Sequence, residues 1–207
     1  MRARDVMSRP VVTVLSETTV KYAANLLASR GFTALPVVDG DDRLIGIVTE
    51  ADLIRDRFPK DARYRRSDDE QSRTPARTVG AVMTSPVTTM NTATDVADLI
   101  TAMWDGRIRS MPIVDDSRVV GIVTRRDLVR IIGRDDNAIE ADVRHRLANY
   151  CGPDRWVVAV EDGVVSLGDE YGDDTERRVA QVLAEAVPGV VAAHVTPSGH
   201  QRRPSDG

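Results

Sequence analysis

A strand-to-helix corner occurs twice in this chain, at residues 46–52 (GIVTEAD) and 121–127 (GIVTRRD). In each copy an apolar β-branched pair ends at a threonine, and an aspartate follows three residues later. This order is typical of a strand, a helix N-cap and the first turn of a helix. Because the same corner is encoded twice in matching surroundings, the chain is constrained to a fold with two similar halves.

The repeat extends well beyond the two corners, which we call the first and the second corner. An opening segment recurs, as VMSRPVVT at 6–13 and VMTSPVTT at 82–89. A strand-like segment also recurs, as LPVVD at 35–39 and MPIVD at 111–115. The offset is 76 residues from Pro10 to Pro86 and 75 residues from Gly46 to Gly121. One residue is therefore missing from the intervening turn, where deletions are tolerated.

These motifs together resemble a tandem pair of CBS domains, a Bateman module, over roughly residues 1–132. The resemblance implies an α+β fold in which two pseudo-symmetric repeats, at 1–57 and 79–133, pack as one module. It also implies an adenosyl ligand (AMP, ADP, ATP or S-adenosylmethionine) in clefts between the repeats. Occupancy of such a cleft would be passed on to an attached domain or to a partner.

The resemblance also implies which residues bind the ligand. The adenine would lie against the first strand of a repeat and an isoleucine, an aspartate would bond the ribose, and a threonine would help to hold ribose or phosphate. The matching residues are Val11, Val12, Thr13, Ile47, Thr49 and Asp52 in the first repeat, and Val87, Thr88, Thr89, Ile122, Thr124 and Asp127 in the second. The same Thr-x-x-Asp pattern is also a capping box, and the two roles do not exclude each other.

One basic residue distinguishes the repeats. In family members that bind phosphates tightly, a basic residue often precedes the proline of the (L/M)P(V/I) segment. The second repeat has Arg109 there and the first has Thr33, so Arg109 is the candidate phosphate ligand, because a guanidinium group matches phosphate oxygens. Arg107, Arg125 and Arg126 could supplement it. The alternative is that Arg109 is an exposed surface or interface cation.

Each repeat is expected to contain one longer amphipathic helix. Its apolar side chains recur at i, i+3, i+4 and i+7, which predicts a buried face. They are Val20, Ala23, Ala24 and Leu27 in the first repeat, and Val96, Leu99, Ile100 and Met103 in the second. Pairs of this family commonly associate through their helices, so the resemblance implies a homodimer.

The chain changes character on either side of the second repeat. Residues 58–78 carry mixed charges without apolar periodicity and predict a solvated linker, whose arginines either face water or reach ligand phosphates or a partner.

After residue 133 the pattern predicts helix, strand, strand, helix, strand. With the motifs VxDGVVSL and VPGVxxxHV, residues 138–196 resemble a BON domain, and the acidic composition of this segment favours an effector module for a protein partner. Residues 197–207 are predicted to be a disordered tail.

Composition and motifs argue against several functional classes. The chain has 28 Lys+Arg and 32 Asp+Glu residues, and its net charge of −4 disfavours a nucleic-acid surface. No apolar run approaches the roughly 18 residues of a membrane span, and no export signal is visible, so a cytoplasmic protein is expected. The three histidines and Cys151 lack the spacing of a metal or catalytic site, and no P-loop, GxGxxG or GxSxG motif occurs. Neither catalysis nor a required cofactor is expected.

The sequence therefore predicts a non-catalytic sensor. An adenosyl ligand would bind between the repeats, change their mutual angle and alter what the C-terminal segment contacts, which requires the ligand to prefer one arrangement. The alternative is a ligand-free dimeric scaffold for protein interaction. Retention of both Thr/Asp pairs favours the sensor, and the missing basic residue in the first repeat favours the scaffold.

Overall fold

The computed structural model describes residues 1–55, 57–58, 75–152, 155–169 and 173–197. The chain divides into two compact units, Met7–Arg125 and a second unit made of Met1–Val6 with Arg126–Gly207. Most of the predicted linker and nearly all of the predicted tail lie outside the described residues. The domain boundaries that the sequence suggests stay a prediction.

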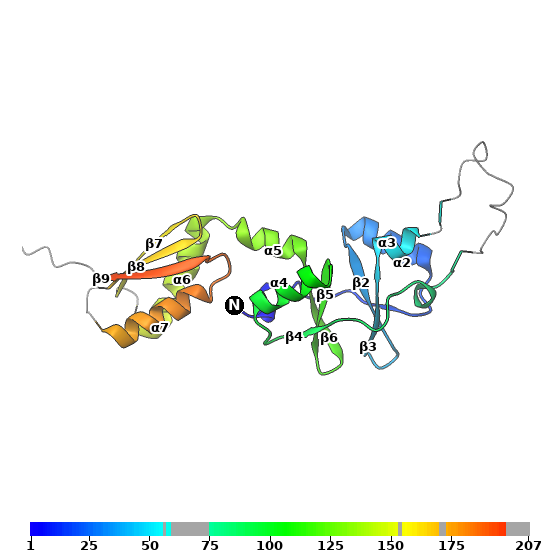
Figure 1. Ribbon diagram of the computed structural model, residues 1–207, viewed down its shortest axis with the longest axis horizontal. Helices are drawn as coiled ribbons and strands as arrows, with labels where there is room; N and C mark the ends of the chain where they lie inside the picture. Colours follow the sequence, from blue (N-terminus) through cyan, green and yellow to red (C-terminus); the bar gives the residue numbers. More distant parts are fainter. Residues whose placement is uncertain (56, 59–74, 153–154, 170–172, 198–207) are drawn as a thin grey trace, which may run out of the picture. The chain divides into compact units, whose positions relative to one another are not determined.

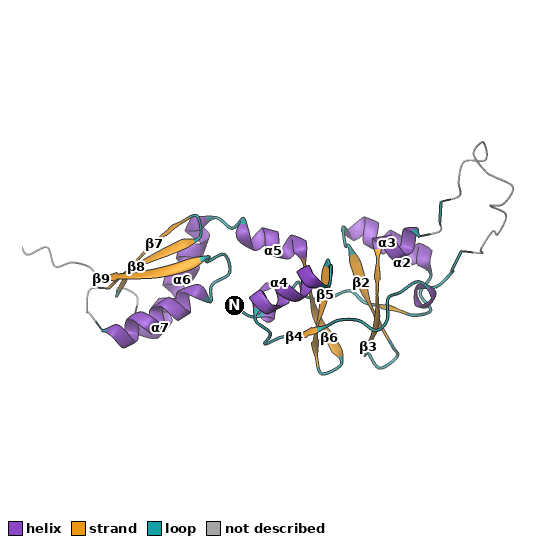
Figure 2. Cartoon of the chain, in the orientation of Figure 1, coloured by secondary structure: helices purple, strands orange, loops and turns teal. Residues whose placement is uncertain are grey.

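The unit Met7–Arg125 contains two three-stranded sheets of the same topology, one from each repeat (Figure 1; Figure 2). In each sheet the first two strands are parallel and the last two are antiparallel. The elements of the first repeat are β1 (Val14–Leu15), α2 (Val20–Arg30), β2 (Ala34–Val38), β3 (Leu44–Thr49) and α3 (Glu50–Ile54). Those of the second repeat are the 3-10 turn η3 (Val79–Ala81), β4 (Met90–Asn91), α4 (Val96–Asp105), β5 (Ser110–Asp115), β6 (Arg118–Thr124) and α5 (Arg125–Ile132).

The two sheets also share their register, which confirms that the sequence repeat is a structural repeat. Pro36 pairs with Ile47 in the first sheet, and Pro112 pairs with Ile122 in the second. Each antiparallel pair has one register shift. It lies between the two residues that follow the proline of β2 or β5, at Val37/Val38 and Ile113/Val114. The two repeats pack as a single compact unit, as the sequence predicts.

The opening of each repeat lies against the other repeat. Ser8 and Ile122 exchange two backbone hydrogen bonds of 2.8 and 3.2 Å. Thr84 and Ile47 exchange two of 2.9 and 3.0 Å. The two connections are equivalent and crossed, since the first opening bonds the second corner and the second opening bonds the first corner.

This crossing corrects the predicted first strands. Residues 11–13 and 87–89 were expected in strands, but β1 begins only at Val14 and β4 only at Met90. Each of these three-residue segments follows a bridge to one sheet and precedes a strand of the other sheet. Because the segment crosses between two sheets, its backbone pairs with neither.

A methionine of each opening packs over a glycine of the opposite corner. An added Cβ at Gly46 would lie 2.4 Å from Met83 Sδ, and one at Gly121 would lie 2.4 Å from Met7 Sδ. Both distances are far below van der Waals contact, so only glycine lets the opening approach the strand this closely.

The predicted helix faces are correct except at one equivalent position. Val20, Ala23 and Leu27 of α2 are buried, as are their counterparts in α4. Ala24 is exposed, however, and Ile100 is 45% exposed. Each helix covers a sheet of only three strands, so it buries a narrower stripe than the sequence pattern suggests.

The helices α2 and α4 end with the same hydrogen bonds but with different residues. In each, an N–H just beyond the helix bonds to a carbonyl in its last turn, Phe32 to Leu27 at 3.0 Å and Ile108 to Met103 at 2.8 Å. The residue before that N–H has a left-handed backbone, with φ of 65° at Gly31 and 51° at Arg107. Glycine is the usual residue there, and a residue with a Cβ costs about 1–2 kcal/mol in this conformation. Arg107 therefore occupies an unfavourable backbone position.

The second unit has the predicted order of helix, strand, strand, helix, strand. These elements are α6 (Asp136–Cys151), β7 (Trp156–Glu161), β8 (Val164–Asp169), α7 (Asp174–Glu185) and β9 (Ala192–Pro197), and a short helix α1 (Ala3–Val6) that the sequence did not predict also belongs to this unit. The sheet order is β7-β8-β9, and residues of α6 and α7 form one core with the inward side chains of the strands. Arg177 Nε donates to Asp169 Oδ2 at 2.7 Å, which pairs this buried carboxylate.

The glycine–methionine contacts predict a ranking of alanine variants. Gly121→Ala should lower the free energy of unfolding by roughly 1–3 kcal/mol, because the new Cβ meets Met7 as far back as its Cβ, at 3.1 Å. Gly46→Ala should cost less, since the three atoms nearest to the new Cβ are Sδ, Cγ and Cε of Met83, which can move more easily. Urea unfolding followed by circular dichroism measures both.

Gly40→Ala is the matched control, because nothing lies within 4 Å of a Cβ at that position. Its effect should stay within about 0.5 kcal/mol. Equal stability of all three variants would contradict the close packing of the openings.

Candidate functional site

The first corner is a closed capping box, as the sequence predicts. Asp52 Oδ2 accepts from the Thr49 backbone N–H at 2.9 Å and from Thr49 Oγ1 at 2.7 Å, while the Asp52 N–H donates to Thr49 Oγ1 at 3.4 Å. Both side chains are half-buried. None of the described residues bonds Asp52 Oδ1, so this oxygen can accept hydrogen bonds from a ligand hydroxyl without breaking the cap.

The crossing brings the second opening to this corner. Thr84 is bonded to Ile47, whose side chain is 8% exposed, and residues 87–89 follow three positions later. Val87 and Thr89 are half-buried and Thr88 is exposed. Their backbone groups are outside any strand, so they can bond a ligand edge that lies beside Ile47.

A chain of hydrogen bonds links the first corner to the start of β5. Glu50, the first residue of α3, donates its N–H to the Thr33 carbonyl at 3.3 Å. Thr33 Oγ1 lies 3.1 Å from Ser110 Oγ, and Ser110 is buried at 5% exposure. Arg109 directly precedes Ser110, is exposed, and has no ion pair with any described residue. The candidate phosphate ligand thus lies close to the first corner, although it belongs to the second repeat.

The second corner has the same local backbone. Ile122 is half-buried and bonded to Ser8, and the half-buried Thr124 ends β6 where α5 begins. Asp127 is the third residue of α5, belongs to the second unit, and is 7% exposed. Arg130 Nη1 lies 3.5 Å from Asp127 Oδ1, whereas Arg55, which occupies the equivalent position of the first repeat, forms no ion pair with Asp52 among the described residues.

The structure therefore resolves a question that the sequence leaves open. The sequence does not say which opening belongs with which corner, and the structure pairs each opening with the corner of the other repeat. Sequence reasoning missed three residues: Thr84 and its counterpart Ser8, whose backbone groups bond the opposite corners, and Ser110, whose Oγ lies 3.1 Å from Thr33 Oγ1. The recurrence of a hydroxyl residue two positions before each opening proline was the available signal for the first pair.

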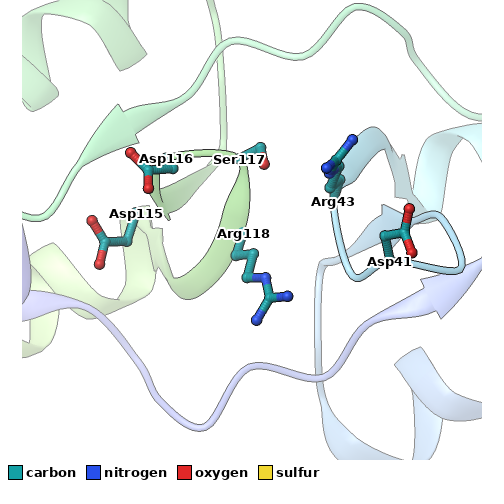
Figure 3. A pocket seen from close by; sticks show the side chains of 6 residues that line it. All are labelled: Asp41, Arg43, Asp115, Asp116, Ser117 and Arg118. Carbon is teal, nitrogen blue, oxygen red and sulfur yellow. The ribbon is translucent and has the colours of Figure 1, made fainter.

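A cavity of about 310 Å³ lies elsewhere in this unit, between the β2–β3 turn and the β5–β6 turn (Figure 3). It is lined by Asp41, Arg43, Asp115, Asp116, Ser117 and Arg118. Figure 3 shows the Arg43 and Arg118 side chains pointing away from each other, and the carboxylates outnumber the guanidinium groups. None of the predicted ligand residues lines this cavity.

The cavity lies beside Asp39, a carboxylate whose pKa is lowered. The hydrogen bond from the Arg43 backbone N–H, at 2.9 Å, is the main cause that lowers the pKa of Asp39, and the Asp41 N–H adds to it. Both bonds shape the β2–β3 turn, so the shift reports turn structure and does not indicate catalytic chemistry.

Two further properties of the described part of the chain bear on function. No group of three or more His, Cys, Asp or Glu side chains there is placed to hold a metal ion. Among the described helices, none has the length and apolar character needed to cross a bilayer.

Comparison with known proteins connects this geometry to a family. The family model described as CBS domain matches residues 3–57 and 79–134. The chain is 30% identical over 155 residues to an inosine-5′-monophosphate dehydrogenase of Methanocaldococcus jannaschii, an alignment that covers 73% of this chain and 28% of that relative. The chain thus spans less than a third of the length of this relative.

Two solved structures are similar to the same part of the chain. One is the CBS domain pair of protein MJ0100 in complex with 5′-methylthioadenosine and S-adenosyl-L-methionine, with 29% identity, a TM-score of 0.53, and coverage of 64% of this chain and 96% of that one. The other is CBSX2 in complex with AMP, with 29% identity, a TM-score of 0.53, and coverage of 62% and 93%.

The capping box predicts a stability cost that is independent of any ligand. Thr49→Ala should lower the free energy of unfolding by about 1 kcal/mol, because the α3 start loses the acceptor for the Asp52 N–H. Glu50→Ala, in the same helical turn but exposed, should change it by less than about 0.5 kcal/mol. Equal losses in the two variants, measured by urea unfolding, would show that the cap contributes nothing.

Proposed function

Because the chain belongs to the CBS domain family, we propose that it is a non-catalytic regulatory protein that binds an adenosyl ligand between its two repeats. The observation that carries this proposal is the composite site formed by the first corner and the second opening. There the Asp52 carboxylate is held by its cap and keeps one oxygen for a ligand. The two solved CBS pairs named above hold adenosyl compounds, which supports this ligand class.

The roles of the residues follow from the chemistry of an adenosyl group. The adenine lies against Ile47 and the backbone of residues 87–89, which offers both an apolar surface and unpaired polar groups. The ribose hydroxyls donate to Asp52, and Thr49 orients that carboxylate. Arg109 bonds the phosphate, if the ligand has one, because its guanidinium group is exposed and close to this corner.

The first opening and the second corner form an equivalent composite site, and its residues take the same roles for a second ligand. They are Val11, Val12, Thr13, Ile122, Thr124 and Asp127. The pairing of Asp127 with Arg130 and the presence of Thr33 in place of an arginine make this site different from the first. We therefore expect unequal affinities for the two sites.

Signalling would follow from the crossed connections. A ligand at the first corner touches residues of both repeats, so its affinity depends on how the repeats are arranged. A ligand shifts the equilibrium toward the arrangement that it binds better. The second unit, whose BON-like character remains a proposal, would then present a changed surface to a protein partner. The cytoplasmic location predicted from the sequence also stays a prediction.

The ligand-free dimeric scaffold remains the second candidate, and exposed apolar side chains favour it. In the unit Met7–Arg125, Tyr22 is 60% exposed, Ile100 is 45% exposed and Trp104 is 77% exposed. Ile100 and Trp104 are four residues apart and lie on one face of α4. A second copy packing against this face would bury it, which is consistent with the homodimer that we propose for either function.

Ligand binding predicts a rise in the thermal unfolding midpoint. An adenosyl ligand at a hundredfold excess over its dissociation constant adds about 2.7 kcal/mol, which corresponds to a shift on the order of 5–10 °C for a chain of this size. We expect this shift with at least one of AMP, ADP, ATP, S-adenosylmethionine and 5′-methylthioadenosine, and its loss in Asp52→Ala.

Two controls separate ligand contact from stability. Glu50→Ala removes an exposed carboxylate from the same helical turn, which has no proposed ligand role, so it should retain the shift. Asp41→Ala removes a carboxylate from the turn cavity and should retain all of it. No shift with any of the five compounds at millimolar concentration would contradict the sensor and leave the scaffold.

The dimer predicts a change of mass in one surface variant. Trp104→Arg places a charge on the proposed contact and should convert the dimer to a monomer in light scattering at micromolar concentration. Val182→Arg is the matched control, because Val182 is 64% exposed on α7 in the other unit. A monomeric mass for the wild-type chain would refute the homodimer.

A further inference from the structure

Met7 and Met83 seat the two openings on the opposite corners. An added Cβ at Gly121 would lie 2.4 Å from Met7 Sδ, and one at Gly46 would lie 2.4 Å from Met83 Sδ. Neither notch therefore has room for one more atom between the sulfur and the glycine that it covers. Both methionines are half-buried, so each side chain lies in its notch and is also reachable from solvent.

The two side chains lie next to the bonds that cross between the repeats. Each methionine directly precedes a residue of the crossed bonds, Ser8 or Thr84. Met83 also packs against the core formed by α2, β2 and β3 of the first repeat, although it belongs to the second opening. A methionine that leaves its notch therefore displaces the backbone that makes these bonds.

A thioether differs from the other apolar side chains because it can be oxidised. The sulfur lone pair attacks one oxygen of hydrogen peroxide, and the O–O bond breaks as the S–O bond forms. The second oxygen leaves as hydroxide and takes the proton of the transferred hydroxyl group to become water, so sulfur loses two electrons and the peroxide gains them. Methionine sulfoxide is polar and chiral and disrupts apolar contacts, and methionine sulfoxide reductases restore the thioether.

We propose that Met7 and Met83 are paired oxidation sites, and that hydrogen peroxide or another two-electron oxidant acting there releases the openings from the opposite corners. The sulfoxide oxygen has no room between the sulfur and the glycine. A polar group held in an apolar contact without a hydrogen bond is unfavourable, so the oxidised side chain turns out of the notch. This release needs no ligand at the corners and is independent of the adenosyl site.

Three other methionines provide comparisons within the same chain. Met103 and Met111 are 2% and 0% exposed, so peroxide should leave them unchanged while the fold is intact. Met90 is half-buried, but it lies in β4, where it pairs with Ile113 of β5. Oxidation of Met90 should therefore not account for a release of the openings.

The test treats the full-length chain with hydrogen peroxide and follows two quantities. Peptide mass spectrometry should find sulfoxide at Met7 and Met83 and none at the two buried methionines. Hydrogen exchange of the amides that make the crossed bonds should become at least roughly tenfold faster, because an unsatisfied polar group raises the population of the open form. These amides belong to Ser8, Ile47, Thr84 and Ile122. The amides of β8, in the other unit, should keep their exchange rates.

Replacing both sulfur atoms separates oxidation from packing. The double variant Met7→Leu with Met83→Leu keeps two apolar side chains of similar volume, so it should fold, and its crossed amides should not respond to peroxide. Met90→Leu is the matched control and should respond as wild type does. Treatment of the oxidised wild-type chain with methionine sulfoxide reductase should restore slow exchange.

Three results would overturn the paired oxidation sites. The first is sulfoxide at both positions with unchanged exchange of the crossed amides. The second is the absence of sulfoxide at both positions while the chain stays folded. The third is faster exchange in the peroxide-treated double variant, because the response would then not come from these two sulfur atoms. Since no ligand is added, a failure here leaves the adenosyl site untouched, and thermal shifts test that site separately.

Discussion

The crossed backbone hydrogen bonds are the constraint on which the Met7–Arg125 unit depends. Each repeat alone would have a three-stranded sheet whose first strand is only two residues long, and a unit of this size is marginally stable by itself. The bonds of Ser8 to Ile122 and of Thr84 to Ile47 tie each opening to the other repeat. Separating the repeats would break these four backbone bonds and others, such as the bond from the Leu44 N–H to the Ser117 carbonyl at 2.9 Å. The crossing also means that any ligand beside Ile47 contacts both repeats.

Local features of this fold could be predicted from the sequence, because they depend on residues a few positions apart. The Thr49–Asp52 box and the buried stripe of α2 follow from spacing alone. The crossing could not be predicted, since Ser8 and Ile122 are far apart in the chain and their contact depends on how whole repeats pack. The same holds for residues 11–13, which look like a strand but have no partner while they pass between sheets. Ile100 was misjudged because the pattern shows which residues are apolar, not how wide the surface is that they cover.

For the candidate site, the sequence suggests the residues, and the structure shows which of them lie near one another. The family resemblance implies Asp52 as a ribose ligand and Arg109 as a candidate phosphate ligand, and these two residues belong to different repeats. The hydrogen bonds from Glu50 through Thr33 to Ser110 show that Arg109 lies near the Asp52 corner. The repeats share a backbone, so their differences in charge are not required by the fold. Such differences are where function is expected to override local preference.

The glycine–methionine contacts limit how the repeats can move. Met7 and Met83 fill notches that only glycine leaves open, and packed interfaces of this kind are not continuously deformable. A change of angle between the repeats must therefore move both methionines to another packing, which favours two discrete arrangements over a gradual change. The helix α5 starts directly after Thr124 and continues into the second unit, so a change at the second corner is passed on through a covalently continuous helix. Coupling then requires only that a ligand at the corners prefers one of the two packings.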